Sequence, residues 1–260
     1  MITAKEKSVV FYLFKRVFRQ LLFVFMWFLI GGVIFPMTLS LITGSNYNLL
    51  QAIRSLELGP TFYLVIGCLA LLSYDDFKLL IQNGVSRYTY WKAKVITFIG
   101  ISVLSQTIAI IYFFLMRLIL NGNRWEDYSL FMQVYGGFFK NTTIAYLVSF
   151  IFAILSAGVF SLSCILVGSI FSLFTKRQRR LIILALITLF IVGIATISNT
   201  YQHIAFNAEP WFVNTLNFLV GYDKGGTLNP TMPFIDMVLL GIIVCFGSLQ
   251  VIKRFKIRNE

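Results

Sequence analysis

The chain has 260 residues, of which 58% are hydrophobic and only 12% are charged. Soluble domains contain about 45–50% apolar and about 25% charged residues, so this composition excludes a water-soluble globular protein. The net charge is +12, but the basic residues gather in short clusters beside apolar runs, which is how membrane topology is encoded. We therefore predict an all-α polytopic membrane protein with no nucleic-acid partner.

Residues 5–20 are predicted to form an amphipathic helix. Its apolar residues recur with helical spacing, and Lys15, Arg16 and Arg19 fall on the other side. We expect this helix to lie in the cytoplasmic interface of the bilayer, with the three basic side chains as its anchors. The alternative is a simple cytoplasmic extension of the first span. The apolar positions are Val10, Leu13, Phe14, Val17, Phe18 and Leu21.

Six apolar runs are predicted to cross the membrane, since about 20 residues span roughly 30 Å of hydrocarbon. The second run is short, and we expect its helix to continue through Asp75 and Phe77 into water. The fourth is longer than a bilayer requires, so it either tilts or projects, with Gly158 permitting a bend, or it consists of two half-spans, which would change the topology. The predicted spans are Leu21–Thr43, Pro60–Tyr74, Val95–Leu120, Thr142–Phe174, Leu181–Ser198 and Pro233–Ile252.

The connection between the second and third spans, residues 75–94, is predicted to form a sharp elbow. Asn83-Gly84 is a helix stop, because glycine reaches the left-handed conformation without a Cβ clash. Ser86 is a good N-cap for the next helix. Such an elbow below the membrane is either a docking site for a cytoplasmic partner or a capped, basic turn that fixes topology.

The connections outside the membrane differ in character. Gly44–Gly59 and Asn121–Phe139 are interpreted as ordinary loops. Asn199–Met232 contains signals for local structure: Pro210 precedes several large apolar residues, and a glycine-rich turn follows at Gly225–Gly226. Proline favours the first turn of a helix, so we predict a short outer helix from Trp211 that dips into the outer interface. No linker divides the chain, and residues 1–260 are assigned to one transmembrane domain.

Topology follows from the basic residues. Most of the 22 lysines and arginines precede the first span, occupy the elbow and the connection after the fourth span, or follow the last span. Cationic segments resist translocation, so this side is predicted to be cytoplasmic. An even number of spans then places both termini in the cytoplasm, in a multi-pass protein of the cell (inner) membrane.

The sequence contains few residues or motifs typical of a catalytic site. Its one histidine, His203, falls in an external loop and is interpreted as solvated. The chain has neither an HExxH motif nor a GxxxxGK[ST] phosphate-binding loop. We predict no catalytic residue, no metal ligand and no cofactor bound by this chain. A secondary transporter and an intramembrane protease are disfavoured, because the predicted spans lack central charged or catalytic groups.

The elbow carries a family resemblance. Gln82-Asn83-Gly84-Val85-Ser86-Arg87, followed by Lys92, resembles the "GvsR" segment of bacterial type-2 ABC-transporter permeases, the membrane subunits of exporters common in Gram-positive bacteria. The predicted layout resembles that family as well: an amphipathic N-terminal helix, six spans, an elbow between spans two and three, and an outer helix before span six. The motif covers about a dozen residues, and the layout covers the whole chain.

The resemblance implies a function. In such permeases the elbow docks in a groove of a separate ATPase, which binds ATP and Mg; this chain would have no nucleotide site of its own. It also implies a second permease, identical or different, and two ATPase subunits. An aromatic, weakly charged interior favours an amphipathic substrate such as a peptide, drug or lipid, and no substrate-binding residue is assigned. The alternative is a non-transporting module, such as a sensor partner or a peptide-immunity protein. The coupling residues carried over are Asn83, Gly84, Val85, Ser86 and Arg87.

Overall fold

The computed structural model describes residues 3–44, 46–54, 56, 58–72, 74–120, 129–201, 210–222 and 228–255. Within these ranges the secondary structure is helical, apart from one isolated β-bridge between Tyr222 and Leu228. His203 and the turn at Gly225–Gly226 lie outside the described residues. The elements are α1 (Ala4–Leu29), a π-helical segment η1 (Ile30–Ile34), α2 (Phe35–Thr43), α3 (Leu49–Arg54), α4 (Leu58–Leu71), α5 (Tyr74–Gln82), α6 (Arg87–Leu120), α8 (Leu130–Tyr135), a 3₁₀ turn η2 (Gly136–Phe138), α9 (Thr142–Ser172), α10 (Lys176–Tyr201), α11 (Pro210–Val220) and α12 (Thr231–Lys253).

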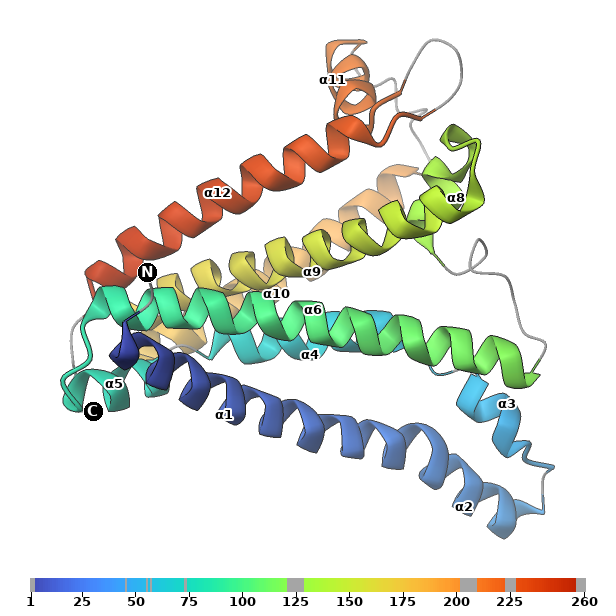
Figure 1. Ribbon diagram of the computed structural model, residues 1–260, viewed down its shortest axis with the longest axis horizontal. Helices are drawn as coiled ribbons and strands as arrows, with labels where there is room; N and C mark the ends of the chain where they lie inside the picture. The colour runs from blue at the N-terminus through green and yellow to red at the C-terminus, as the bar shows by residue number, and fades with distance from the viewer. Residues whose placement is uncertain are drawn as a thin grey trace.

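The long helices run roughly along the horizontal axis of Figure 1, and α12 and the α1–α2 stretch splay apart away from the elbow. The start of α1, the short helix α5 and the end of α12 lie together at one end. The small helices α3 and α8 lie toward the opposite end, and α11 lies beside the start of α12, away from the elbow. The predicted elbow therefore shares one end of the bundle with the outermost turns of the first and last helices.

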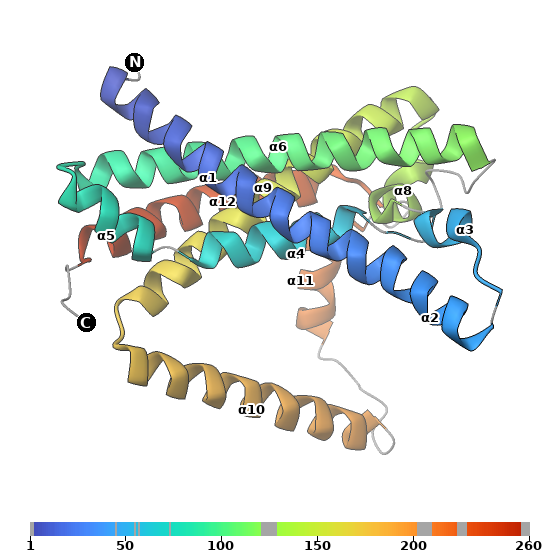
Figure 2. The ribbon, with the colours of Figure 1, turned by 90° about the horizontal axis from the view of Figure 1, so that it is seen from below.

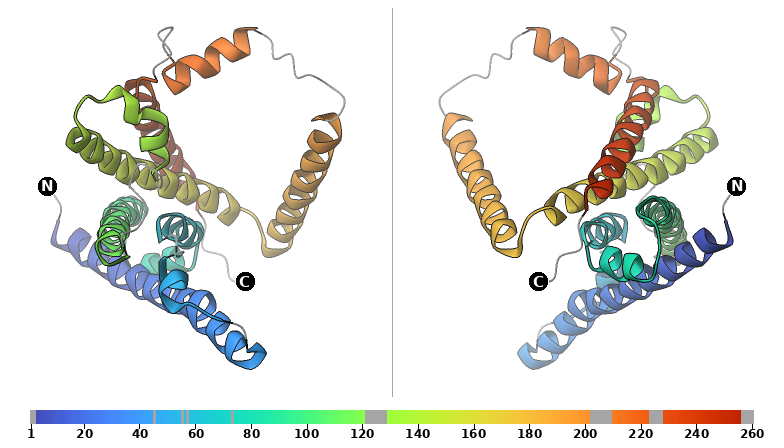
Figure 3. Two further views of the ribbon diagram at one scale, coloured as in Figure 1. Left: turned by 90° about the vertical axis from the view of Figure 1, so that its right-hand side faces the viewer. Right: turned by 90° about the vertical axis from the view of Figure 1, so that its left-hand side faces the viewer.

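Four helical segments of the described chain are long and apolar enough to cross a membrane: Ala4–Thr43, Arg87–Leu115, Thr142–Ser172 and Thr231–Lys253. The fourth predicted span coincides with one uninterrupted helix, α9, a point that the sequence left open. The fifth coincides with the helix α10, which stands apart from the other long helices (Figures 2 and 3). The full set of six spans remains a prediction.

The second predicted span differs most from the expectation. The sequence indicated one helix that continues into water, but α4 has 14 residues and ends at Leu71, and α5 begins separately at Tyr74. The apolar run gave no signal for this break. At the break, a side chain from a neighbouring helix binds the free carbonyls of α4. The Lys94 ammonium of α6 donates hydrogen bonds to the carbonyls of Ala70 (3.1 Å) and Leu72 (3.4 Å), carbonyls freed at the end of α4.

The predicted amphipathic segment is the first part of a helical stretch that continues without interruption to Thr43. Its buried residues lie four apart, at Val9, Leu13, Val17 and Leu21, and three of them are among the predicted apolar positions. No break separates the amphipathic part from the apolar part. The structure therefore agrees with the alternative of an extended first helix better than with a separate interfacial helix.

The core of the bundle forms where α9 packs against α4, α6 and α12. Ile66, Ile101 and Ile165 are almost completely buried there. Gly168 of α9 lies against the end of α4, where an added Cβ would be 2.7 Å from Leu71 Cα and closer still to its carbonyl oxygen. A small residue at this position lets the two backbones approach closely, as in other packed membrane helices.

The end opposite the elbow contains more helix than expected. The interpretation of Asn121–Phe139 and Gly44–Gly59 as loops is wrong in part, because they contain α8, η2 and α3. Phe131 of α8 packs against Phe152 of α9 and Phe234 of α12, with ring centroids 4.8 and 6.4 Å away. Aromatic packing across helices thus orders a segment whose local sequence reads as a loop. A short helix is present before the last predicted span, as α11, which begins at Pro210; its place on the outer side remains a prediction.

Candidate coupling elbow

The turn that ends α5 has the geometry predicted for Asn83-Gly84. Gly84 has φ +72°, in the left-handed region, and open space around its Cα. Its N–H donates to Ile81 O (3.0 Å), and the next N–H, of Val85, donates to Leu80 O (3.0 Å). This is a Schellman C-cap, in which glycine avoids the steric cost of the left-handed conformation.

The following helix starts where the sequence predicted. The Ser86 hydroxyl accepts a hydrogen bond from Thr89 N–H (3.1 Å), and α6 begins at Arg87. The Tyr90 N–H donates to Ser86 O (2.9 Å), the first bond of the helix. The Asn83 side chain donates to Leu79 O (2.8 Å) at the end of α5. Both sides of the elbow are therefore fixed by caps within the chain.

An apolar cluster lies under the turn and joins it to the two ends of the chain. Val85 is 7% exposed and Tyr90 is completely buried. The ring of Phe77 meets that of Phe255 edge to face, with centroids 4.8 Å apart. We call this set the elbow cluster: Val9, Leu13, Phe77, Leu80, Val85, Tyr90, Ala93, Ile252 and Phe255. The elbow is thus built from α1, α5, α6 and the segment that ends α12.

Polar contacts tie the elbow to the first and last helices. The Arg87 guanidinium donates from Nη1 to the backbone carbonyl of Lys253 (2.9 Å), at the end of α12. The Lys5 ammonium donates to Gly84 O (2.8 Å), and Lys92 forms an ion pair with Glu6 (3.3 Å). A cation at the C-terminus of a helix also interacts favourably with the helix dipole, so Arg87 stabilises the last turn of α12.

The three residues predicted to anchor the N-terminal helix fall into two groups. Arg16 forms an ion pair with Asp76 of α5, which connects α1 to the elbow. Lys15 and Arg19 are exposed. The sequence could not reveal the Arg16 contact, because Arg16 and Asp76 come from different helices. Anchoring in the interface by Lys15 and Arg19 remains a prediction.

Four of the five predicted coupling residues reach the surface. Asn83, Gly84, Ser86 and Arg87 are exposed, whereas Val85 faces the elbow cluster. Sequence reasoning missed Tyr88, which is 51% exposed beside them. A large aromatic side chain on a basic turn was the signal that could have identified it. We call the exposed set the elbow rim: Gln82, Asn83, Gly84, Ser86, Arg87 and Tyr88.

The rim has the chemistry of a contact surface. It offers a cation, an aromatic ring and several hydrogen-bonding groups. Within the described ranges, no three His, Cys, Asp or Glu side chains gather in a way that could hold a metal ion. Comparison of the chain with protein-family models, with curated proteins and with solved structures finds no match.

Proposed function

We propose that this chain is the membrane permease subunit of an ATP-driven exporter, and that the elbow rim docks on a separate cytoplasmic ATPase. The observation that carries the proposal is the construction of the elbow. It is a capped turn that exposes Arg87 and Tyr88 and is fixed from below by buried Val85 and Tyr90. A turn that only fixed the membrane topology would need positive charge. It would not need buried side chains such as Val85 and Tyr90 to hold its shape.

The contacts under the rim give a route for mechanical coupling. The elbow is covalently continuous with α5 and α6, bonded to α12 through Arg87 and bonded to α1 through Lys5. Close-packed side chains transmit displacement, because compact interiors deform little. A partner that pushes on the rim would therefore move the ends of α1, α6 and α12 together.

The remaining parts of the proposal follow the family resemblance. The elbow and both termini face the cytoplasm, and six helices cross the cell membrane. Two permeases, identical or different, work with two ATPase subunits that bind ATP and Mg. The cargo is an amphipathic molecule such as a peptide, drug or lipid, in keeping with the apolar and aromatic composition of the helices.

The proposal is tested by purifying the tagged chain from its host in mild detergent and identifying the co-purifying proteins by mass spectrometry. The informative variant is Tyr88→Glu, which places a charge on the rim. Tyr222→Glu is the matched control, because Tyr222 is 52% exposed and follows α11, which lies beside the start of α12 and away from the elbow (Figure 1). A soluble ATPase in near-equal amount, lost with Tyr88→Glu and retained with Tyr222→Glu, supports the permease.

The alternative function is a non-transporting module, which needs no ATPase. Co-purification with a sensor kinase, or with no partner, in both the unmodified chain and the Tyr88 variant would favour it. Arg87→Glu is a less clean test than Tyr88→Glu, because Arg87 also bonds α12. Loss of a partner after that change could come from a displaced helix.

A further inference from the structure

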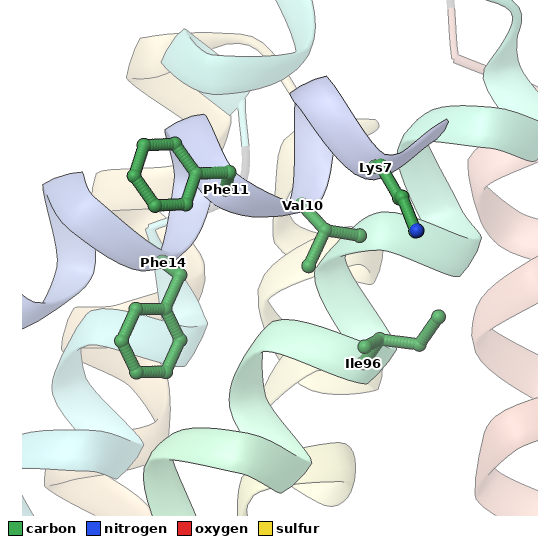
Figure 4. Close-up of a pocket in the computed structure, with 5 residues that line it drawn as sticks. All are labelled: Lys7, Val10, Phe11, Phe14 and Ile96. Atoms are coloured by element: carbon green, nitrogen blue, oxygen red, sulfur yellow. The ribbon is translucent and has the colours of Figure 1, made fainter. Parts of the chain in front are cut away.

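A shallow apolar groove lies between the first part of α1 and the third turn of α6. Val10, Phe11 and Phe14 of α1 and Ile96 of α6 form its walls, and Lys7 lies at one end (Figure 4). The Thr97 hydroxyl, next to Ile96, donates to Val10 O (3.5 Å) and holds the two helices together here. The groove is separate from the elbow rim.

Lys7 is a charged group without a protein counterpart. In the part of the chain that the structure describes, its ammonium has neither a hydrogen bond nor an ion pair. Its neighbours behave differently, since Lys5 donates to Gly84 O and Glu6 pairs with Lys92. An anionic group above the groove would therefore meet a cation that is not already engaged.

The polarity of the groove matches that of a lipid in the nearer leaflet. Lys7 lies toward the helix start, and Phe14 lies about 10 Å further along α1, at about 1.5 Å per residue. Beyond Phe14 the helix enters the apolar run that begins at Leu21. A phosphate at Lys7 would thus direct its acyl chain over Val10 and Phe14 toward the hydrocarbon. Phe11, 70% exposed, would cover one side of that chain.

We propose that this groove is a binding site for one anionic phospholipid, whose phosphate pairs with Lys7 and whose acyl chain lies between α1 and α6. The observations that select this occupant are the unpaired cation, the apolar walls and their order along the helix. The site would hold α1 against α6 from the lipid side. It is independent of whether the elbow binds an ATPase.

The test uses the full chain, delipidated in detergent, titrated with dioleoyl phosphatidylglycerol or dioleoyl phosphatidylcholine and observed by native mass spectrometry. One basic side chain near an anionic headgroup contributes an affinity factor of about five. We therefore expect phosphatidylglycerol to bind about five-fold more tightly than phosphatidylcholine. Lys7→Gln should remove this preference. Lys140→Gln is the control, because Lys140 is an exposed lysine that does not line the groove and is not among the predicted anchors.

Further arms separate the lipid from other occupants. Phe11→Asn should weaken binding of both lipids, and because Phe11 is exposed this change should leave the melting temperature unchanged. Glycerol phosphate, which has the headgroup charge without acyl chains, should not compete. If glycerol phosphate displaced phosphatidylglycerol as well as free phosphatidylglycerol does, the site would bind a free anion and the proposal would be overturned. A dimer in the mass spectrum that disappears with Phe11→Asn would overturn it in favour of a second copy, and an unchanged lipid preference in Lys7→Gln would overturn it outright.

Discussion

Arg87, the first residue of α6, donates a hydrogen bond to the backbone carbonyl of Lys253, the last residue of α12. The two residues are 166 positions apart in the chain, yet their contact closes one end of the bundle. The residue that the family resemblance marked as a coupling group thus also caps another helix. Any force on Arg87 acts directly on the end of α12.

Arg87→Ala should destabilise the end of α12 by about 1 kcal/mol, because an exposed, charge-assisted hydrogen bond is lost from the helix terminus. Tyr88→Ala removes an exposed neighbour without that bond and serves as the control. Hydrogen exchange of the last turn of α12 measures the difference. Faster exchange in both variants, or in neither, would contradict the cap assigned to Arg87.

Gly84→Val should cost about 1–2 kcal/mol, because a β-branched residue is strained in the left-handed conformation. The space around Gly84 is open, so the penalty comes from the backbone and not from a clash. Gly84→Asn is the matched variant, since asparagine tolerates this conformation, and it should cost less. The free energy of unfolding in a detergent titration separates the two. Equal losses would mean that the left-handed turn is not what requires glycine here.

Gly168→Ala should destabilise the bundle by about 1–3 kcal/mol, because the added methyl group would meet the backbone of Leu71, which cannot move aside as a side chain could. Gly158→Ala, in the same helix with nothing within 4 Å of the added Cβ, should be neutral or slightly stabilising. Melting temperatures in detergent provide the comparison. A Gly168 variant as stable as the Gly158 variant would show that α4 and α9 are not in this close contact.

The sequence predicted those parts of the elbow that depend on interactions between residues close together in the chain. Asn83-Gly84 and Ser86 act through hydrogen bonds within a few residues, so their roles are legible from spacing alone. The bounds of α9 follow its apolar run, but the sequence left open whether that run forms one helix or two.

Other features depend on contacts between distant segments. Val85 is buried in one cluster with Phe255 and Val9, which come from distant parts of the chain. At the break after Leu71, Lys94 of α6 donates hydrogen bonds to carbonyls at the end of α4. The helix α8 packs against α12 through the rings of Phe131 and Phe234. The secondary-structure propensity of a short segment does not show which distant residues it contacts. For the same reason the sequence could not show that Arg16 meets Asp76.

The most direct test of the central claim is photo-crosslinking in the host cell, with benzoylphenylalanine placed at position 88 and, as the control, at position 222. The account predicts an adduct between position 88 and a soluble ATPase, identified by mass spectrometry, and no such adduct from position 222. An adduct from position 88 only with a membrane sensor, or the same products from both positions, would contradict the docking of an ATPase on the elbow rim.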